Sequence, residues 1–491
     1  MGGGFGAVIV IVLVMAVPLF IGFAAGKKSL PTSEDYFLQG RGMGGIFVFA
    51  TVVTTWWSAF AFLGSNSWFF LRGPLYWTSL GWNLFFGVLY LIIGKRVWYF
   101  GRVNKYMTAK DFFVHHYGSK TLANFIAFGM LLFTIPNLQI QLTGGAYLIE
   151  VGSGGIIPFW LAGLLFYVVI ITYVWAGGVR AIAWTDILHG IMLFFGMVIG
   201  GFFIVNLVGG TTGMFQQLSE IVPQNMHLHE GDWMPWVAMF FITPIGVLMG
   251  PHMWTRMFAV KSGKIFDIMP FLIGFVAIAY IGSMLVGNSA RILTPDIARP
   301  DTVFPVILLE YAPFIFAVIL ISCGATAAMS TANSQVHSMA SIYALDFHKE
   351  YINKNLSDQK TVWVGRYAIL IMSAAAYVLA LTATDFLITI GLFSLSGLAQ
   401  VVVPTVGALF WRRSTKEGAA VGMAVGFFLV VAFQFQWLPL PGPFAIGGAG
   451  LLGLLCNIAA FVIVSLLTKP RPDSIIDEIN EQYQGFYHGE K

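Results

Sequence analysis

Charged side chains are scarce in this sequence. Only 10% of its 491 residues are Asp, Glu, Lys or Arg, whereas 58% are hydrophobic, and the mean hydropathy is +0.80. A soluble protein would carry about 25% charged residues, so a soluble globular chain is excluded. The composition predicts an all-α integral membrane protein, because helices satisfy their own backbone hydrogen bonds inside a bilayer.

Cysteines and catalytic motifs are also rare or missing. The two cysteines, Cys323 and Cys456, lie in apolar segments and predict neither a disulfide framework nor a metal site. The chain has no HExxH, CxxC or GxSxG motif, and its core spans offer almost no His, Asp or Glu at one depth, which argues against an enzyme. A Walker loop is missing too, so uphill transport would need an ion gradient or a partner subunit.

What the sequence does contain is a series of apolar runs of about 20 residues, the length that crosses a bilayer. They predict thirteen transmembrane helices, over residues 6–26, 44–70, 74–94, 121–149, 156–176, 182–208, 233–258, 265–288, 314–343, 362–384, 386–411, 418–436 and 446–468. If the N-terminus lies outside, the inner loops and span ends hold every Lys and Arg except Arg72, Arg291 and Arg299. The positive-inside rule therefore predicts a multi-pass cell-membrane protein with an outer N-terminus and a cytoplasmic C-terminus.

The second and seventh spans contain poor helix formers. Residues 51–55 are all Thr or Val, which are β-branched. The seventh span holds Pro244, Gly246, Gly250 and Pro251, which free backbone carbonyls and bend a helix. Because the two spans are five apart, they suggest an inverted repeat of two five-helix halves, with the binding site at the breaks. Two ordinary kinks are the alternative.

The ninth span, 314–343, is unusually polar for a transmembrane helix. Its polar side chains include Thr326, Ser330, Thr331, Asn333, Ser334 and Gln335. Such groups need partners in hydrocarbon, and small residues let another helix approach closely. Hydroxyl groups can also offer oxygens to a desolvated cation. Tight helix packing is the simpler explanation of this span taken alone.

Three stretches resemble the sodium:solute symporter family. Residues 176–190, AGGVRAIAWTDILHG, are similar to the family's GG-x-x-AV-x-x-TD stretch, and residues 327–335, AAMSTANSQ, to its A-x-MST-x-x-S/C-Q helix. Residues 397–425, GLAQVVVPTVGALFWRRSTKEGAAVGMAV, resemble its G…P…FWRR-T-x-x-GA-x-xG-M signature. With the span layout, the resemblance covers about residues 40–468.

The resemblance implies a LeuT-type 5+5 inverted repeat with one extra helix before it and two after it. The corresponding segments are an extra N-terminal helix and cytoplasmic loop (1–43), a first repeat of helices 2–6 (44–208), an extracellular loop (209–232), a second repeat of helices 7–11 (233–411), two C-terminal helices (412–468) and a cytoplasmic tail (469–491). The tail is polar and is expected to be dispensable to the fold.

The resemblance also implies a sodium site between the second and ninth spans. Its ligands would be the carbonyls of Thr54, Trp57 and Ala327 and the hydroxyls of Ser330 and Thr331. Such oxygens suit a hard cation. Asn333, Ser334 and Gln335 are assigned to packing.

Asp186, of the TD motif, is expected at the cytoplasmic end of its span. There the resemblance implies that it serves the ion pathway. Pairing with the nearby Arg180, or helix capping, is the alternative.

The solute is less well specified. By position, the solute contacts are expected to be Trp56, Ser58, Phe60, Gln139, Gln141, Thr143, Thr243, Val247, Ser396 and Gln400, although each could equally be a packing residue. The GLAQ…P stretch resembles carriers of monocarboxylates and related organic acids. No Arg or Lys is expected deep in a core span, so an anion would be held by amides, hydroxyls and helix N-termini.

The leading hypothesis is therefore sodium-coupled symport of a small organic solute, a monocarboxylate or related acid, by alternating access. A pantothenate-like vitamin or an amino acid are alternative solutes. A proton-coupled symporter of the same fold, and a transporter-like sensor or channel, are alternative functions. Na⁺ is the only ion implied. No organic cofactor, nucleic-acid partner or obligate protein partner is inferred. The chain is expected to be embedded in the lipid bilayer.

Overall fold

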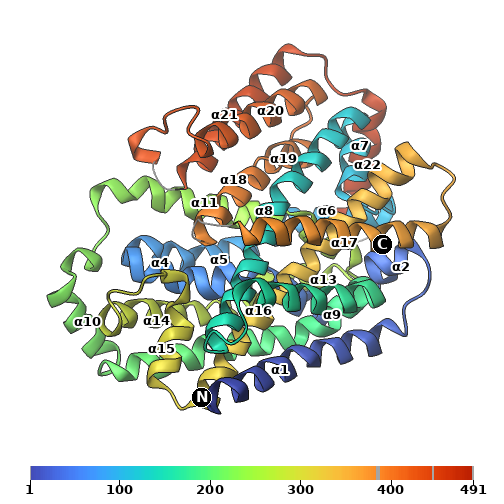
Figure 1. Ribbon diagram of the computed structural model, residues 1–491. Coiled ribbons are helices and arrows are strands. Elements are labelled where there is room, and N and C mark those ends of the chain that lie inside the picture. The colour runs from blue at the N-terminus through green and yellow to red at the C-terminus, as the bar shows by residue number, and fades with distance from the viewer. Residues whose placement is uncertain (1, 383–386, 445–446, 489–491) are drawn as a thin grey trace.

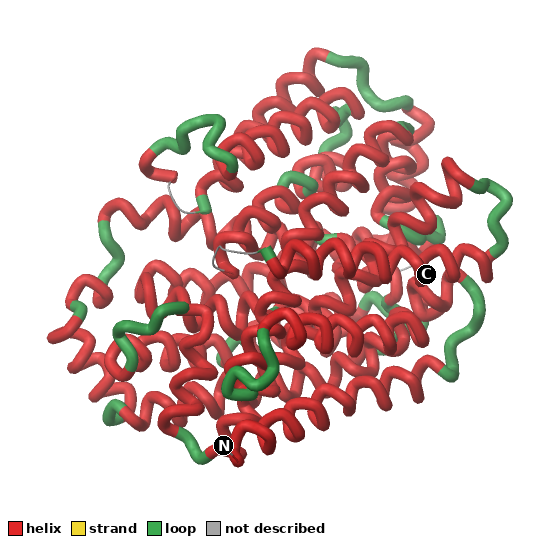
Figure 2. The backbone as a smooth tube through the Cα atoms, in the orientation of Figure 1, coloured by secondary structure: helices red, strands yellow, loops and turns green. Residues whose placement is uncertain are grey.

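The computed structural model describes residues 2–382, 387–444 and 447–488, and within these ranges the chain forms helices and no β-strand (Figure 2). The expected span limits at 384, 386 and 446, and the last residues of the tail, lie outside the described residues. The helical class predicted from composition is therefore confirmed.

The helices follow one another with short connections. They are α1 (Gly2–Gly26), α2 (Ser33–Leu38), α3 (Gly45–Trp56), α4 (Ser65–Arg72), α5 (Thr78–Leu89), α6 (Lys95–Val103), α7 (Ala109–Tyr117), α8 (Lys120–Gly152), α9 (Phe159–Leu207), α10 (Gly210–Ile221), α11 (Trp233–Met249), α12 (Pro251–Ala259), α13 (Lys264–Val276), α14 (Ala279–Leu293), α15 (Val303–Tyr311), α16 (Phe314–Ile342), α17 (Asp358–Leu381), α18 (Leu387–Ala399), α19 (Val402–Phe410), α20 (Lys416–Gln434), α21 (Gly448–Leu467) and α22 (Asp473–His488). Short 3₁₀ or π turns join some of them: η1 (Gln39–Arg41), η2 (Phe60–Gly64), η3 (Gly73–Trp77), η4 (Tyr90–Gly94), η5 (Pro223–Met226), η6 (Glu230–Asp232), η7 (Pro300–Thr302), η8 (Tyr343–Ile352) and η9 (Gly442–Phe444).

Eleven continuous helical segments of the described chain are long and apolar enough to cross a membrane. Two of them, Phe60–Val103 and Phe159–Leu207, each cover parts of two predicted spans. Inside α9, Gly178 has a φ of 54°, which interrupts the helix between the spans predicted at 156–176 and 182–208. A side chain there would also meet the Tyr36 carbonyl oxygen at 2.4 Å, so only glycine fits. Thirteen crossings remain a prediction.

Helix α16 lies in the interior of the bundle, with α1 at one edge and the α20–α21 pair at the opposite edge (Figure 1). Nearly all of α16 from Ala317 onward is buried. The N-terminus lies at the end of the molecule that carries α10 and α15, and the C-terminus lies at the other end, with α2 (Figure 1). The two termini therefore lie at opposite ends of the bundle (Figure 1).

The segment expected to be a dispensable tail forms a packed helix. Ile479 of α22 is only 5% exposed, and the Tyr483 hydroxyl donates to the Leu409 carbonyl at the end of α19. Gln482 exchanges hydrogen bonds with Asn104 after α6. Helix α22 is thus part of the fold, and its hydrophobic face explains why a largely polar segment is ordered.

Candidate ion and solute site

The first predicted break is present between α3 and η2. Helix α3 ends at Trp56, and Trp57 has an extended backbone with ψ of 98°. The break therefore follows the β-branched run 51–55, which itself stays helical. Two amide side chains hold the broken segment. Asn83 accepts the indole N–H groups of Trp56 and Trp57 at 2.5 and 2.8 Å, and Gln141 accepts the freed Ala59 N–H at 3.0 Å.

The second predicted break separates α11 from α12. Gly250 has a ψ of 140°, and Pro251 starts the next helix at a position where its missing N–H costs nothing. Gly246, one turn earlier, lets α11 approach α18 so closely that a side chain would meet the Leu395 carbonyl oxygen at 2.4 Å. The Gly and Pro residues that predicted this break therefore account for its position.

Helix α16 meets the first break as expected. The Thr331 hydroxyl lies 3.3 Å from the carbonyl oxygens of both Thr54 and Thr55. Ser330, on the same helix, lies one residue earlier and is fully buried. Trp57 and Ala327, the other two expected ligand positions, lie on the same two segments and are buried as well. Of the predicted ligand groups, the structure therefore brings the Thr54 carbonyl and the Thr331 hydroxyl into contact.

Asp186, near the start of the predicted span 182–208, lies beside these residues. Its carboxylate is fully buried and accepts hydrogen bonds from the Ser330 hydroxyl at 2.9 Å and the Thr51 hydroxyl at 2.5 Å. The Asn333 amide and the His189 ring also lie within 3.5 Å of it. Asp186 therefore connects α9 to both α3 and α16 at the candidate ion site.

The burial and the ionic partner of Arg256 differ from two expectations. Arg256 is 1% exposed, so the prediction that no Arg or Lys lies deep in a core span is wrong. It is also the ionic partner of Asp186, at 3.5 Å, whereas Arg180 pairs with Asp35 at 2.6 Å. The distribution of Lys and Arg among the loops predicts only that Arg256 lies at the inner end of its span. A buried carboxylate such as Asp186 requires a cation, and that requirement was the missed signal.

Every nitrogen of the Arg256 guanidinium has a protein acceptor. Nε donates to the Thr51 hydroxyl at 2.9 Å and Nη1 to the His252 carbonyl at 2.8 Å. Nη2 donates to the hydroxyls of Thr55 and Ser334. Ser334 and Asn333, assigned above to packing, therefore belong to the Asp186–Arg256 network. The guanidinium ties α12 to α3 and α16 and is not free to bind an anionic solute.

The group formed by Thr54, Thr55, Ser330, Thr331 and Asp186 supplies the chemistry that a sodium ion needs. Two main-chain carbonyls at a helix break, two hydroxyls and one carboxylate are all hard oxygen donors. They are buried, so a cation bound there would exchange its water shell for protein oxygens. Because Arg256 already compensates the Asp186 charge, an added cation would be attracted mainly by dipoles.

A small cavity of about 20 Å³ lies next to this group, between the two breaks. Five expected solute contacts line it: Trp56, Ser58, Phe60, Thr243 and Val247. Gln335, which is assigned to packing above, lines it as well, and so does His252. Within the described chain, three buried polar atoms of this lining have no hydrogen-bond partner: Thr243 Oγ1, His252 Nδ1 and Gln335 Oε1. At this volume the cavity has room for about one water molecule, so a polar solute would reach these groups only in a more open conformation of the bundle.

The other expected solute contacts are not in the lining of this cavity. Gln139 donates to the Leu379 carbonyl on α17, and Gln141 holds the first break. Gln400 donates to the Gly450 carbonyl on α21, and Ser396 lines a separate cavity near α20. Thr143 is buried elsewhere on α8. The packing alternative therefore describes Gln139 and Gln400 best.

Two interrupted helices that meet a buried polar helix in a membrane-spanning bundle define the architecture of a secondary transporter. The model of the sodium:solute symporter family matches residues 36–426, so the chain belongs to this family. The family resemblance inferred from the three sequence stretches is confirmed. Members of this family and the relatives below are transporters, so the expectation that the protein is not an enzyme is also confirmed.

Individual relatives are distant but cover most of the chain. A sodium/pantothenate symporter of Haemophilus influenzae is 28% identical over 409 residues, 80% of this chain and 82% of that protein. A sodium/proline symporter of Salmonella typhimurium is 25% identical over 501 residues, covering 96% of this chain and 94% of that one. A solved Na⁺-coupled sialic acid symporter, 18% identical, superimposes with a TM-score of 0.80 over 96% of this chain and 99% of its own. This last likeness shows a shared fold.

Proposed function

We propose that this protein is a sodium-coupled symporter that takes up a small organic acid by alternating access. The observation that carries the proposal is the contact between the Thr331 hydroxyl and the carbonyls freed at the first break, beside Ser330 and Asp186. Thr54, Trp57, Ala327, Ser330 and Thr331 would bind the ion, and Asp186 would accept it on its way through the protein. Sodium bound there would join α3 to α16 and favour one conformation of the bundle.

Proton coupling is the second candidate, and the buried Asp186 is the observation that favours it. Two features support sodium instead. The remaining oxygens at the site come from neutral carbonyls and hydroxyls, which coordinate a metal cation but do not take up an additional proton at physiological pH. The family and both named relatives are also sodium symporters.

The proposed solute is a small carboxylate. Pantothenate, proline and sialic acid, the solutes named for the three relatives, all carry a carboxylate group. In this chain Arg256 is fully occupied, so the carboxylate would be bound by neutral donors around the cavity, with Thr243 and His252 as the unpaired candidates. Trp56, Ser58, Phe60 and Val247 would surround its apolar part.

The finer topology belongs to the same proposal. The breaks at Trp57 and Gly250 support two five-helix repeats, residues 44–208 and 233–411. The asymmetric distribution of Lys and Arg supports a plasma-membrane orientation with the N-terminus outside.

The solute can be identified by ligand-dependent thermal stabilisation of the purified protein, measured in sodium and in potassium buffer. We expect one or more small carboxylates, from a panel including pantothenate, lactate, pyruvate and proline, to raise the unfolding temperature only when sodium is present. The neutral amide of each positive acid is the matched control. Equal stabilisation in potassium, or by acid and amide alike, would overturn the proposal.

A further inference from the structure

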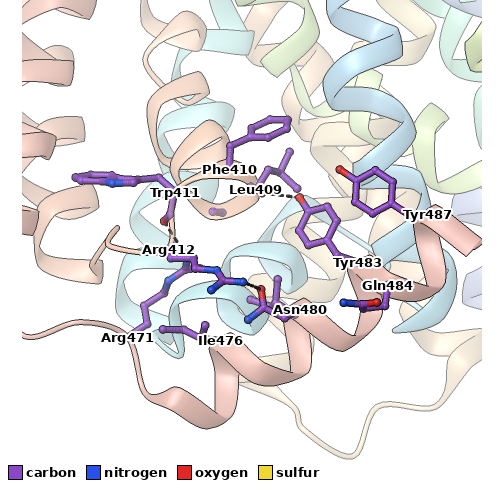
Figure 3. Close-up of a pocket in the computed structure, with 12 residues that line it drawn as sticks. Leu409, Phe410, Trp411, Arg412, Arg471, Ile476, Asn480, Tyr483, Gln484 and Tyr487 are labelled. Carbon is purple, nitrogen blue, oxygen red and sulfur yellow. Dashed lines mark hydrogen bonds between the residues drawn. The ribbon is translucent and has the colours of Figure 1, made fainter.

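A second and larger cavity lies far from the ion site, between the end of α19 and the C-terminal helix α22 (Figure 3). Its volume is about 420 Å³, within the range of about 300–1,000 Å³ typical of small-molecule sites. Its polar lining includes Arg412, Arg471, Asn480, Tyr483 and Tyr487. The family relationship assigns no role to this cavity, which lies at the end of the molecule predicted to be cytoplasmic.

Two guanidinium groups line the cavity without a carboxylate to balance them. Among the described residues, neither Arg412 nor Arg471 forms an ion pair. Arg412 donates to the Asn480 side-chain oxygen at 3.2 Å, a contact visible in Figure 3. Arg471 donates to the main-chain carbonyls of His116 and Trp411, both at 3.1 Å. All of these partners are neutral.

Arg471 has an unused donor. Its side chain is 7% exposed, and its Nε atom is buried without a hydrogen-bond partner in the described chain. Burial lowers the pKa of this guanidinium, and the groups that oppose the shift are the phenols of Tyr117 and Tyr483. An unpaired buried donor on a charged group is costly, so an acceptor from outside the chain would relieve it.

A third guanidinium, that of Arg96, contacts a residue of the cavity wall without lining the cavity itself. Arg96 lies over the ring of Phe410, which lines the cavity, at 4.9 Å, and over Phe486 of α22 at 5.5 Å. Its Nε is likewise buried without a partner among the described residues. The cavity therefore combines positive charge with tyrosine and tryptophan walls. The charge suits an anion, and the walls suit an organic group attached to it.

We propose that this cavity binds a phosphate ester, with Arg412 and Arg471 contacting the phosphoryl oxygens and α22 closing over the organic part. The fork of an arginine matches two oxygens of a tetrahedral phosphate, and two such forks balance a group that carries up to two negative charges. The phosphate could belong to the headgroup of an anionic phospholipid or to a soluble phosphorylated metabolite, since both present the same chemistry. The site is independent of the transported solute and of the sodium site.

The test uses the full-length protein, stripped of lipid in a neutral detergent. One sample receives glycerol 3-phosphate, a second receives phosphatidylglycerol, and a third receives phosphatidylcholine. Thermal unfolding reports stabilisation, and native mass spectrometry counts bound lipid. We expect a rise in unfolding temperature of about 2 °C or more with one of the two anionic probes and a smaller rise with phosphatidylcholine. A response to glycerol 3-phosphate indicates a soluble ligand, and a response to phosphatidylglycerol alone indicates a lipid headgroup.

Two variants test whether the thermal stabilisation arises from binding in this cavity. Asn480→Asp keeps the acceptor of Arg412 but places a carboxylate in the cavity, and Arg412→Gln removes an exposed guanidinium, so both should abolish the stabilisation. Lys354→Gln, an exposed residue that lies outside the cavity, removes one charge from the same predicted face and should leave the stabilisation unchanged. The absence of any response to both anionic probes would overturn the proposal. An equal loss in Lys354→Gln, or an unchanged response in Asn480→Asp, would overturn it as well.

Discussion

Ser330 and Thr331 are adjacent on α16, yet their hydroxyls contact different elements. Thr331 reaches the carbonyls of Thr54 and Thr55 on α3, whereas Ser330 reaches Asp186 on α9. Successive residues on a helix point about 100° apart, so this pair can join two neighbouring helices at one depth. That division explains why two hydroxyl residues occur in a row at this point of α16.

Replacing both hydroxyls, as Ser330→Ala with Thr331→Val, should weaken sodium binding. We expect the sodium concentration that gives half-maximal uptake to rise about tenfold or more, equivalent to about 1.4 kcal/mol of binding free energy. Ser322→Ala is the matched control, because that buried hydroxyl donates only to the Val318 carbonyl of its own helix. If the double variant and the control had the same sodium dependence, α16 would not supply ion ligands.

The Asp186–Arg256 ion pair makes a separate prediction. Asp186→Asn or Arg256→Met alone leaves one buried charge unpaired, which costs about 3–5 kcal/mol, so each should reduce the amount of folded protein. The double variant removes both charges and should recover much of that loss, as size-exclusion chromatography would show. If Asp186 also serves the ion, the double variant will fold but remain defective in sodium-dependent uptake. Full recovery of uptake would restrict Asp186 to a structural role.

At the scale of elements, the two breaks differ in their dependence on a side chain from another helix. The α3 break exposes the Ala59 N–H, and Gln141 of α8 accepts it. The α11–α12 break needs no such acceptor, because Pro251 has no N–H to satisfy. The first break is therefore the one that a single distant substitution can disturb.

Gln141→Leu should destabilise the protein by about 1–3 kcal/mol, because it leaves the buried Ala59 N–H without a partner. Gln139→Leu on the same helix is its control, since Gln139 donates only to the partly exposed end of α17. Thermal unfolding of the two variants in detergent, together with their uptake rates, measures the difference. A larger defect in Gln139→Leu would contradict the positioning role of Gln141.

The second break could be predicted because its cause is local: Gly250 and Pro251 disfavour a continuous helix whatever surrounds them. The first break was expected from the β-branched run 51–55, but that run stays helical and the break follows it at Trp57. The partner of Asp186 could not be predicted in this way. Arg256 lies 70 positions away in the chain, and only the fold of α12 brings it back to α9. Charge sorting identifies the side of the membrane on which a loop lies, but it does not show that a guanidinium at a span end turns inward.

At the scale of the whole molecule, only some of the solute contacts could be predicted from the sequence. Trp56, Phe60, Thr243 and Val247 lie at the breaks, and the structure places them around one cavity. Gln139 and Gln400 are polar residues within spans that form helix–helix contacts instead. Polarity alone does not distinguish a residue that lines a cavity from one that joins two helices. Helix rotation, which decides between the two, depends on packing across the entire bundle.

Helix α22 extends the packed structure beyond the last span. Removing residues 473–491 would expose the surface covered by Ile479, a side chain worth about 1.5–3 kcal/mol when fully buried, and would remove the hydrogen bond from Tyr483 to Leu409. We expect the truncated protein to unfold at a temperature lower by about 5 °C or more. A truncation that stops after residue 488 retains α22 and serves as the control. Equal stability of both truncations would show that α22 is dispensable, as its polarity first suggested.

The central claim is that a sodium gradient drives solute entry through this fold. The most direct test is uptake of the labelled carboxylate that stabilises the protein, measured in proteoliposomes under an imposed sodium gradient, a proton gradient, or neither. The account predicts accumulation above the outside concentration with the sodium gradient alone, and none with the proton gradient alone. Accumulation driven by protons, or entry that only equilibrates whichever gradient is imposed, would contradict it.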